Sequence, residues 1–360
     1  MRPMSPRRVF LHVGTPKSGV TGLQRRLAAN RKLLADQGIL YPDQPHDNHF
    51  HPAVDLTERE WAGEAERARG RWDQLAADAN RAGGDVLISH EVLAAATPDQ
   101  VGRAFRSFPD SEVHVVLTAR DLGRQLPAEW QESVTHRARS SFSKYAKRVA
   151  RAPRSRPELW FWRVHSVPDV LTRWGTGLPP DQVHVVTVPQ EDGPAGALWE
   201  RFGRVLGLDP ALPYAEVDEA EPALGIAEML VLRRLNTRLR ELDVPRETYG
   251  ALVRALLVRE TFAQRPGTEP AVVPPRRREF VDEVTTEWLE WLRGSGVDVV
   301  GDLADLQPVW PDPDTSRHPD NPRAQDVTDA AIDALAAFLA NVEKDGDTSL
   351  VRVARRLLRP

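Results

Sequence analysis

A glycine-flanked turn near the start of the chain carries the residues best suited to hold an anion. The stretch GTPKSGVT begins at Gly14, and Gly14 and Gly19 permit tight backbone geometry. Lys17 supplies a mobile positive charge, and Ser18 and Thr21 supply hydroxyl donors. Backbone N–H groups before a helix point at an anion, and the helix dipole adds to the attraction. The pattern predicts a phosphate-gripping loop; a plain strand-to-helix turn with an incidental lysine is the alternative.

The lysine of this loop stands in the wrong place for a P-loop of the Walker A type. That motif puts Gly-Lys-Ser/Thr after four spacer residues, with the hydroxyl on magnesium. Here Gly19 is followed by Val20, and Lys17 precedes that glycine by two residues. A P-loop kinase-like phosphotransferase would therefore lack its key residue, and we keep it only as an alternative.

The loop lies within a pattern of apolar runs that alternate with helical segments. Apolar runs predict buried strands at 8–13, 85–89, 112–118 and 183–188. Helical patterns cover 21–35, 57–82 and 98–105. Strands that alternate with helices predict an α/β protein, a P-loop-like three-layer fold with a central parallel sheet flanked by helices.

The last third of the chain reads as helical additions to that sheet. Helical patterns cover 224–242, 249–262, 276–293 and 327–342. We expect one α/β domain over 1–310, a linker over 311–323 and a helical tail over 324–360. The predicted buried face of the tail helix comprises Val327, Ala331, Leu335, Phe338 and Val342. The final basic segment, LVRVARRLLRP, predicts a helix packed on the body, with a membrane-surface helix as the alternative.

Composition narrows the function classes. The chain has 360 residues and a net charge of -4, which argues against a general nucleic-acid binder. It has no cysteine, which excludes disulfide scaffolds, thiolate metal sites and cysteine nucleophiles. No stretch approaches the roughly 20 apolar residues that span a bilayer, and we expect a cytoplasmic protein without a transmembrane segment.

The anion loop resembles the 5′-phosphosulfate loop of sulfotransferases that use 3′-phosphoadenosine 5′-phosphosulfate (PAPS). Their pattern is Pro-Lys-Ser/Cys-Gly-Thr-Thr at the end of the first strand. This chain reads PKSGVT, so Val20 replaces the first threonine and Thr21 keeps the second. The resemblance to this family, in the form of a bacterial sulfotransferase-like protein, implies that the donor is bound by Pro16, Lys17, Ser18, Gly19, Val20, Thr21 and Gly22.

A second element of the family's pattern follows at the third long apolar run. The sequence VVLTAR looks like the strand that ends in the arginine that grips the 3′-phosphate, here Arg120. The family's serine falls eight residues later, where this chain has Ala128. A water, Gln131 or a nearby Ser or Arg would have to replace the missing hydroxyl.

A third element comes between these two. In the family's cytosolic branch, the preceding strand ends in a histidine that acts as catalytic base, and the sequence VLISHE puts His90 there. Glu91 is the alternative base, since some carbohydrate-type members use a glutamate. On an extended strand the two side chains face opposite sides, unless a turn intervenes. The resemblance covers roughly residues 8–210.

The resemblance implies transfer of a sulfuryl group from PAPS to a hydroxyl or amine of a carbohydrate, glycolipid or small metabolite. Lys17 would neutralise charge on the bridging oxygen, and no metal is required. The implied partner is a small-molecule or carbohydrate acceptor, not a nucleic acid. A homodimer is among the open oligomeric states. Because Val20 and Ala128 depart from the pattern, a noncatalytic nucleotide-binding module on the same scaffold is a further alternative.

Three other clusters allow two interpretations each. The segment from His46 to His51 has a His-x-His spacing at His49 and His51 that could suggest a metal. We favour a substrate-lining loop, because zinc needs a third ligand and closed geometry. Bulky aromatic side chains line either the core or a ligand site, and they are Trp130, Trp160, Phe161 and Trp162. A basic run forms either a solvated face or a binding surface for an anion, and it comprises Arg137, Arg139, Lys144, Lys147, Arg148, Arg151 and Arg154.

Overall fold

The structure is a computed structural model. It describes residues 6–44, 48–59, 63–154, 157–190, 193–194, 196–217, 224–312 and 315–344. His46 and the final basic segment, residues 350–360, lie outside the described residues, so the expectations for them stay predictions.

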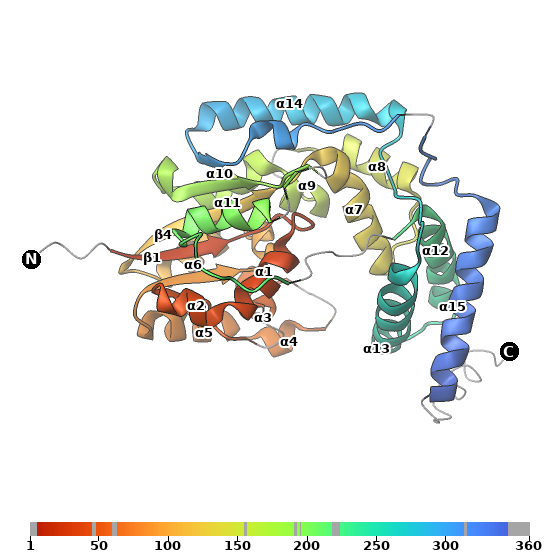
Figure 1. Ribbon diagram of the computed structural model, residues 1–360, viewed down its shortest axis with the longest axis horizontal. Coiled ribbons are helices and arrows are strands. Elements are labelled where there is room, and N and C mark those ends of the chain that lie inside the picture. Colours follow the sequence, from red (N-terminus) through yellow and green to blue (C-terminus); the bar gives the residue numbers. More distant parts are fainter. Residues whose placement is uncertain are drawn as a thin grey trace, which may run out of the picture. The chain divides into compact units, whose positions relative to one another are not determined.

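One parallel sheet, formed by six strands within the described residues, organises the first part of the chain (Figure 1). The strands are β1 (Arg7–His12), β2 (Ile39–Leu40), β3 (Asp85–Ser89), β4 (Ser111–Ala119), β5 (Val183–Thr187) and β6 (Asp298–Val300). The four strands expected from apolar runs are confirmed as β1, β3, β4 and β5. The sequence missed β2 and β6, because two or three residues are too few to show a strand pattern.

Helices account for most of the remaining described structure. The α-helices of the first 220 residues are α1 (Val20–Ala29), α2 (Arg31–Asp36), α3 (Phe50–Thr57), α4 (Ala65–Ala68), α5 (Arg71–Arg81), α6 (Pro98–Arg106), α7 (Leu122–Thr135), α8 (Phe142–Arg151), α9 (Trp160–His165), α10 (Val167–Gly175) and α11 (Ala197–Leu206). Those that follow are α12 (Ile226–Glu241), α13 (Arg246–Tyr249), α14 (Arg278–Ser295) and α15 (Ala324–Lys344). The 3₁₀ segments are η2 (Glu91–Ala95), η3 (Pro180–Gln182), η5 (Phe262–Gln264), η6 (Pro275–Arg277) and η7 (Leu303–Leu306), while η4 (Gly250–Thr261) is a π-helix.

The strand order, β2-β3-β1-β4-β5-β6, puts β1 between β3 and β4. The register pairs His12 of β1 with Ser89 of β3 on one side and with Val116 of β4 on the other. Ligands of open parallel sheets bind beyond the carboxyl ends of the strands, where the strand order reverses. In this sheet that place is the loop after β1, between residues 13 and 19.

One face of the sheet is covered by α1, α2 and α11. Leu23 and Leu27 of α1 and Phe202 of α11 are fully buried in one cluster with Phe10 and Leu87 from the strands. The opposite face is covered in part by α10, which packs against β4 and α6. The sheet therefore lies between two helical layers, as the three-layer prediction requires.

Two of the predicted helices are broken where the backbone turns. The helix expected over 21–35 divides into α1 and α2 at Asn30, whose amide donates to the carbonyl of Arg26 and accepts from the N–H of Ala215. The helix expected over 57–82 is wrong as a single element. It is replaced by the end of α3, then α4 and α5, because Glu58 and Gly70 have positive φ angles of 50° and 75°.

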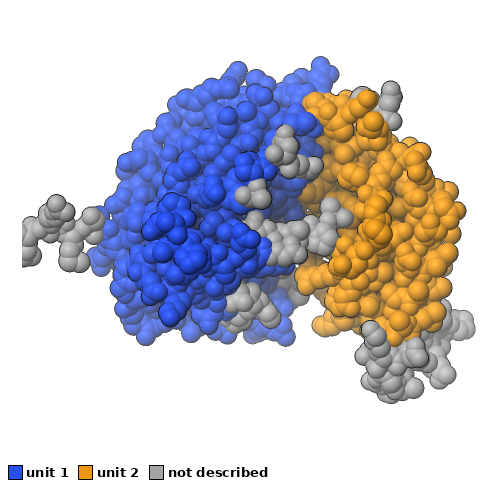
Figure 2. Space-filling model, in the orientation of Figure 1, with its two compact units in different colours: residues 1–125, 151–221, 279–309 blue, residues 126–150, 222–278, 310–360 orange. Residues whose placement is uncertain are grey.

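The chain separates into two compact units (Figure 2). Unit 1 comprises residues 1–125, 151–221 and 279–309 and holds the sheet. Unit 2 comprises residues 126–150, 222–278 and 310–360. The units are defined by contacts and not by independent folding, so the sequence-based division at 311–323 stays a prediction. No helix in the described part of the chain has the length and apolarity that crossing a membrane requires.

The tail helix of unit 2 is confirmed, but its predicted buried face is wrong. In α15 the fully or nearly buried side chains are Ala330 and Ala334, at 0% and 7% exposure. Leu335, which the sequence places on the buried face, is 60% exposed. Contacts with α12 and with the π-helix η4 select the face of small side chains. Ile332 and Leu339 are also exposed, at 58% and 63%, whereas Val327 and Phe338 of the predicted face are half-buried.

Candidate functional site

The loop after β1 has positive φ angles at three positions. Gly14 and Gly19 have φ angles of 112° and 82°, in the region that favours glycine. A Cβ added to Gly19 would lie 2.5 Å from Cδ2 of Leu198, so this position is also closed to a side chain by packing. Lys17 itself is left-handed, with a φ angle of 60°. This conformation leads into α1, whose N-cap is Gly19.

The first turn of α1 shows how the departure from the sulfotransferase pattern is accommodated. Val20 is buried, with 2% exposure. Thr21 is half-buried and Gly22 is buried. Val20 therefore adds apolar packing beneath the helix end, and the half-buried Thr21 is the residue of this pair that carries a hydroxyl.

Ser18 turns its hydroxyl into the protein. Its Oγ donates to the carbonyl oxygen of Thr15 at 2.6 Å and lies 2.5 Å from Oγ1 of Thr118, and the residue has no exposed surface. The Thr118 hydroxyl donates to the carbonyl of Gly14 at 3.0 Å. We assign the Ser18 hydroxyl to the shape of the loop.

A buried histidine extends this network under the loop. Nδ1 of His12 lies 2.8 Å from Oγ of Ser89, and its Nε2 lies 3.2 Å from Oγ1 of Thr118. Burial, with a smaller effect from His90, lowers the pKa of His12 to about 3, so the ring is neutral at neutral pH. Sequence reasoning missed His12, Ser89 and Thr118. The available signal was a polar residue at, or one position before, the carboxyl end of each strand.

Arg120, the predicted 3′-phosphate residue, lies beside the loop. It follows β4 directly, and its Nη1 donates to the carbonyl oxygen of Lys17 at 3.2 Å. Gln125, which sequence reasoning missed, donates from Nε2 to the carbonyl oxygen of Pro16 at 2.6 Å. The same amide nitrogen lies 3.0 Å from Nδ1 of His165. Two side chains that follow β4 thus hold consecutive carbonyls of the Pro16–Lys17 segment.

His90 and Glu91 stand at the turn between β3 and η2. Nδ1 of His90 accepts a hydrogen bond from the N–H of Val92 at 3.1 Å, so His90 caps η2. Burial lowers the pKa of His90. In the neutral ring Nδ1 is the acceptor and the proton lies on Nε2, which leaves Nε2 a donor.

The backbone of Glu91 adjoins the loop after β1. A Cβ added to Gly14 would lie 3.3 Å from Cα of Glu91, so the loop and this residue approach closely. The Glu91 side chain is 29% exposed, and its Oε2 lies 3.7 Å from Nδ1 of His90. That Oε2 is buried and has no hydrogen-bond partner among the described residues.

His49 and His51 are held by contacts within the protein. His49 is fully buried between the carbonyl of Pro42, 3.0 Å from Nε2, and the N–H of Ser89, which donates to Nδ1 at 3.0 Å. Burial lowers the pKa of His49 to about 4. His51 pairs with Glu64 at 3.1 Å. Among the described residues, no group of three or more His, Cys, Asp or Glu side chains is arranged to hold a metal ion.

The remaining predicted residues are Ala128 and the aromatic side chains. Ala128 lies on α7, three residues before Gln131, whose Nε2 donates to the carbonyl of Leu224 at 2.5 Å. The aromatic residues are mostly core, because Trp130, Phe161 and Trp162 have 0–1% exposure. These three side chains are therefore packing residues.

Comparison with known proteins gives one likeness in structure. No family model matches the chain, and no curated protein matches it. Among solved structures, a sulfotransferase from Alicyclobacillus acidocaldarius aligns at 20% identity and a TM-score of 0.39, over 69% of this chain and 97% of that one. At this identity and TM-score the likeness supports no inference about function, and the α/β architecture rests on the sheet itself.

Proposed function

We propose that this protein transfers a sulfuryl group from PAPS to a hydroxyl or amine of a small-molecule or carbohydrate acceptor. The observation that carries the proposal is the contact between Arg120 and the Lys17 backbone, 3.2 Å long. It brings the loop after β1 and the arginine after β4 to one place. A donor with phosphate groups at both its 3′ and 5′ positions needs two such cationic sites.

The residues present fit a phosphosulfate donor. The segment from Pro16 to Gly22 ends at the N-terminus of α1, where backbone N–H groups and the helix dipole favour an anion. Gly19 is exposed and has no side chain to exclude a ligand. Arg120 offers the planar fork of donors that suits the 3′-phosphate. Thr21 supplies a hydroxyl beside the 5′-phosphosulfate.

The transfer requires that negative charge on the bridging oxygen be neutralised and that a proton be removed from the acceptor atom. The acceptor oxygen or nitrogen bonds to sulfur, the bond from sulfur to the bridging phosphate oxygen breaks, and the electron pair stays on that oxygen. Lys17 would neutralise the charge that develops there, an effect typically worth about 10²–10³ in rate per donor. The proton of the acceptor passes to a base on the protein. The products are the sulfated acceptor and adenosine 3′,5′-bisphosphate.

We assign the base to Glu91 and not to His90. The acceptor nitrogen of His90 is already used by the N–H of Val92. Glu91 has a buried carboxylate oxygen without a hydrogen-bond partner among the described residues, and its backbone adjoins Gly14. A carboxylate near the reacting atoms is a competent proton acceptor. His90 would then act as a positioning residue that fixes the turn carrying Glu91.

Calorimetry with adenosine 3′,5′-bisphosphate tests the donor site. We expect binding by the wild-type chain and at least about tenfold weaker binding by Lys17→Ala, because a charge-assisted contact is lost. Lys32→Ala, an exposed lysine on α2, is the control and should bind as wild type does. No binding at millimolar nucleotide would rule out the proposal.

Activity is then measured with sulfur-labelled PAPS and a panel of hydroxylated and amine acceptors. Transfer that disappears in Lys17→Ala supports the enzyme. Nucleotide binding without transfer to any acceptor favours the noncatalytic binding module instead. Magnesium-dependent ATP binding with no affinity for the bisphosphate would favour the kinase-like alternative.

A further inference from the structure

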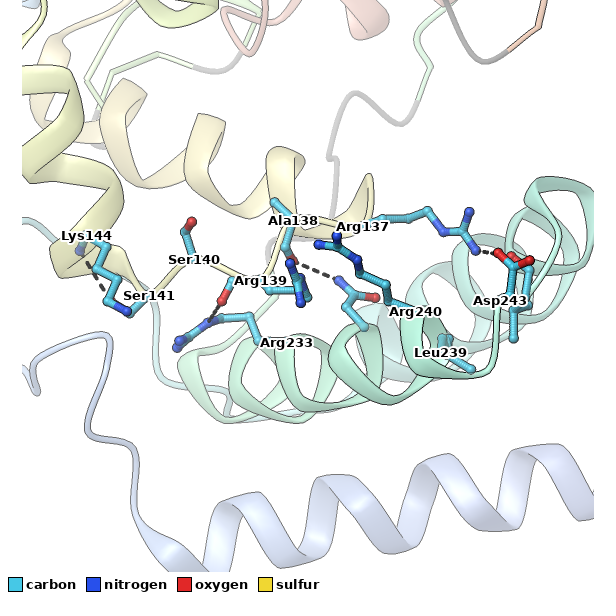
Figure 3. Close-up of a pocket in the computed structure, with 12 residues that line it drawn as sticks. Arg137, Ala138, Arg139, Ser140, Ser141, Lys144, Arg233, Leu239, Arg240 and Asp243 are labelled. Carbon is cyan, nitrogen blue, oxygen red and sulfur yellow. Dashed lines mark hydrogen bonds between the residues drawn. The ribbon is translucent and has the colours of Figure 1, made fainter. Parts of the chain in front are cut away.

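Unit 2 contains a cavity of about 550 Å³ that the sulfuryl-transfer proposal does not use (Figure 3). Its walls come from the connection between α7 and α8, the first turn of α8, the C-terminal half of α12 and the two residues at 243–244. None of its lining residues belongs to the loop after β1 or to β4. Cavities of roughly 300–1,000 Å³ are the usual size for small-molecule sites.

The lining of this cavity is strongly basic. Its charged residues are one carboxylate, Asp243, and five cations, Arg137, Arg139, Lys144, Arg233 and Arg240. The chain as a whole carries a net charge of -4, so this concentration of positive charge is local. A concave wall of one sign focuses the field and attracts ions of the other sign.

Two of the five cations are already engaged with the protein. The Arg137 guanidinium lies 4.6 Å from the ring centroid of Tyr249 and donates to the carbonyl of Val244. Arg233 donates from Nε to the carbonyl of Arg139 at 3.3 Å, and its Nη1 lies 3.5 Å from Asp320. These two arginines therefore build the wall.

The other three cations are not paired with protein groups in the described part of the chain. Arg139, Lys144 and Arg240 are exposed, and their side chains form no hydrogen bond or ion pair with the part of the chain that the structure describes. They come from two separate segments, the connection before α8 with its first turn and the end of α12. Three cations that converge on one cavity from two segments suit a ligand with more than one anionic group.

The floor of the cavity is held in a fixed shape. Asn236, 3% exposed, donates from Nδ2 to the carbonyls of Val134 and Ala138 at 2.8 and 2.9 Å. Its Oδ1 accepts from the Tyr249 hydroxyl at 2.8 Å. Arg137, at the turn so fixed, has a φ angle of 76°. This buried network ties the end of α7 to α12 and sets the positions from which the cations project.

The nearby start of α8 is not the anion site. Its first backbone N–H groups, those of Phe142 and Ser143, donate to the carboxylate of Asp320 at 2.7 and 2.9 Å. The positive end of this helix is thus neutralised within the protein. An anion in the cavity would be held by side-chain cations.

We propose that this cavity binds a small hydroxylated polyanion, a sugar that carries two phosphate or sulfate groups. Arg139, Lys144 and Arg240 would bind the anionic groups. Ser140, Ser141 and the single carboxylate, Asp243, also line the cavity and suit the hydroxyl groups of a sugar. This proposal does not depend on the sulfuryl-transfer proposal.

The test is calorimetry on the full chain with two probes, fructose 1,6-bisphosphate and a disulfated disaccharide, and with fructose as the uncharged control. The measurement is made in a Lys17→Ala/Arg120→Ala background, which weakens binding of anions at the loop after β1. The pocket variant is Arg139→Gln/Arg240→Gln. Its matched control, Lys147→Gln/Arg234→Gln, removes two exposed cations from α8 and α12 that do not line the cavity.

We expect one or both charged probes to bind with the loop residues changed, and fructose not to bind. The pocket variant should bind at least about tenfold more weakly than the matched control, because two charge-assisted contacts are lost. The probe that binds distinguishes phosphate from sulfate as the recognised group. Failure of both probes, or equal affinity of the pocket variant and its control, would overturn the proposal.

Discussion

The Arg120 guanidinium donates to the carbonyl oxygen of Lys17 at 3.2 Å, across 103 residues of sequence. The contact is possible because β1 and β4 are neighbours and both end at the same edge of the sheet. Gln125 adds a second tie at the carbonyl of Pro16. Because both side chains follow β4, the loop after β1 is supported by the next strand as well as by its own helix.

Replacement of Arg120 tests its part in nucleotide binding. We expect Arg120→Ala to weaken binding of adenosine 3′,5′-bisphosphate by about 10- to 100-fold, the usual range for a lost hydrogen bond to a charged group. Arg120→Lys keeps the charge but loses the planar guanidinium donors. Its affinity for the nucleotide should therefore fall between those of the wild type and Arg120→Ala. Calorimetry measures the effect, with exposed Arg106→Ala of α6 as control. Wild-type affinity in Arg120→Ala would contradict the assignment.

Two neighbouring substitutions separate the candidate bases. Glu91→Gln should lower turnover by about 10²-fold or more and leave nucleotide affinity unchanged, because only the proton acceptor is lost. His90→Asn should keep most of the activity, since asparagine can also accept from the N–H of Val92. Transfer assays over a range of pH report both variants. If His90→Asn is the inactive variant and Glu91→Gln is active, the base is His90.

Comparing two glycine-to-alanine variants separates the energetic cost of backbone strain from that of a steric clash. Gly19 and Gly70 are both helix N-caps with positive φ angles, 82° and 75°. An alanine at either position costs about 1–2 kcal/mol for the left-handed backbone. Only at Gly19 does the added Cβ meet a neighbour, Cδ2 of Leu198 at 2.5 Å. We expect Gly19→Ala to lower the free energy of unfolding more than Gly70→Ala, as urea titration measures.

A second substitution, at Leu198, can relieve the steric part of the destabilisation caused by Gly19→Ala. Leu198→Ala in the Gly19→Ala background should recover the steric part of the loss and leave the backbone part. Equal destabilisation by the two single alanine variants would show that Leu198 moves aside at no cost.

The buried histidines predict a loss of stability in mild acid. The pKa values of His12 and His49 are lowered by burial to about 3 and about 4, from 6.5. Below about pH 6.5 the unfolded chain therefore binds protons that the folded chain does not, and the free energy of unfolding falls as pH drops toward those folded values. The slope is about 1.4 kcal/mol per pH unit for each histidine.

Urea unfolding between about pH 7 and about pH 5 measures this slope. His12→Gln should flatten it, whatever its effect on stability at neutral pH. The control is His136→Gln, because His136 is exposed. An unchanged slope in His12→Gln would mean that this ring is protonated in the folded chain.

Local sequence pattern was enough for the main elements of the fold. The four longer strands and α6 follow from apolar runs and helical periodicity, and α6 even carries its capping box at Thr97 and Gln100. The sequence pattern assigns none of the helices α7 to α11, and the predicted buried face of α15 is wrong. Which side of a helix is buried depends on the partner it meets, and α12 and η4 select the small residues Ala330 and Ala334.

The sequence by itself determined the strand-to-helix change after β1, and it predicted an anion-holding loop there, since the glycines and Lys17 are within the same short segment. Tertiary structure alone decided what surrounds it. The inward Ser18 hydroxyl, the neutral His12 and the capping role of His90 depend on groups brought together from β1, β3 and β4. Burial and hydrogen-bond partners from distant segments fix protonation and direction, and no local pattern contains them.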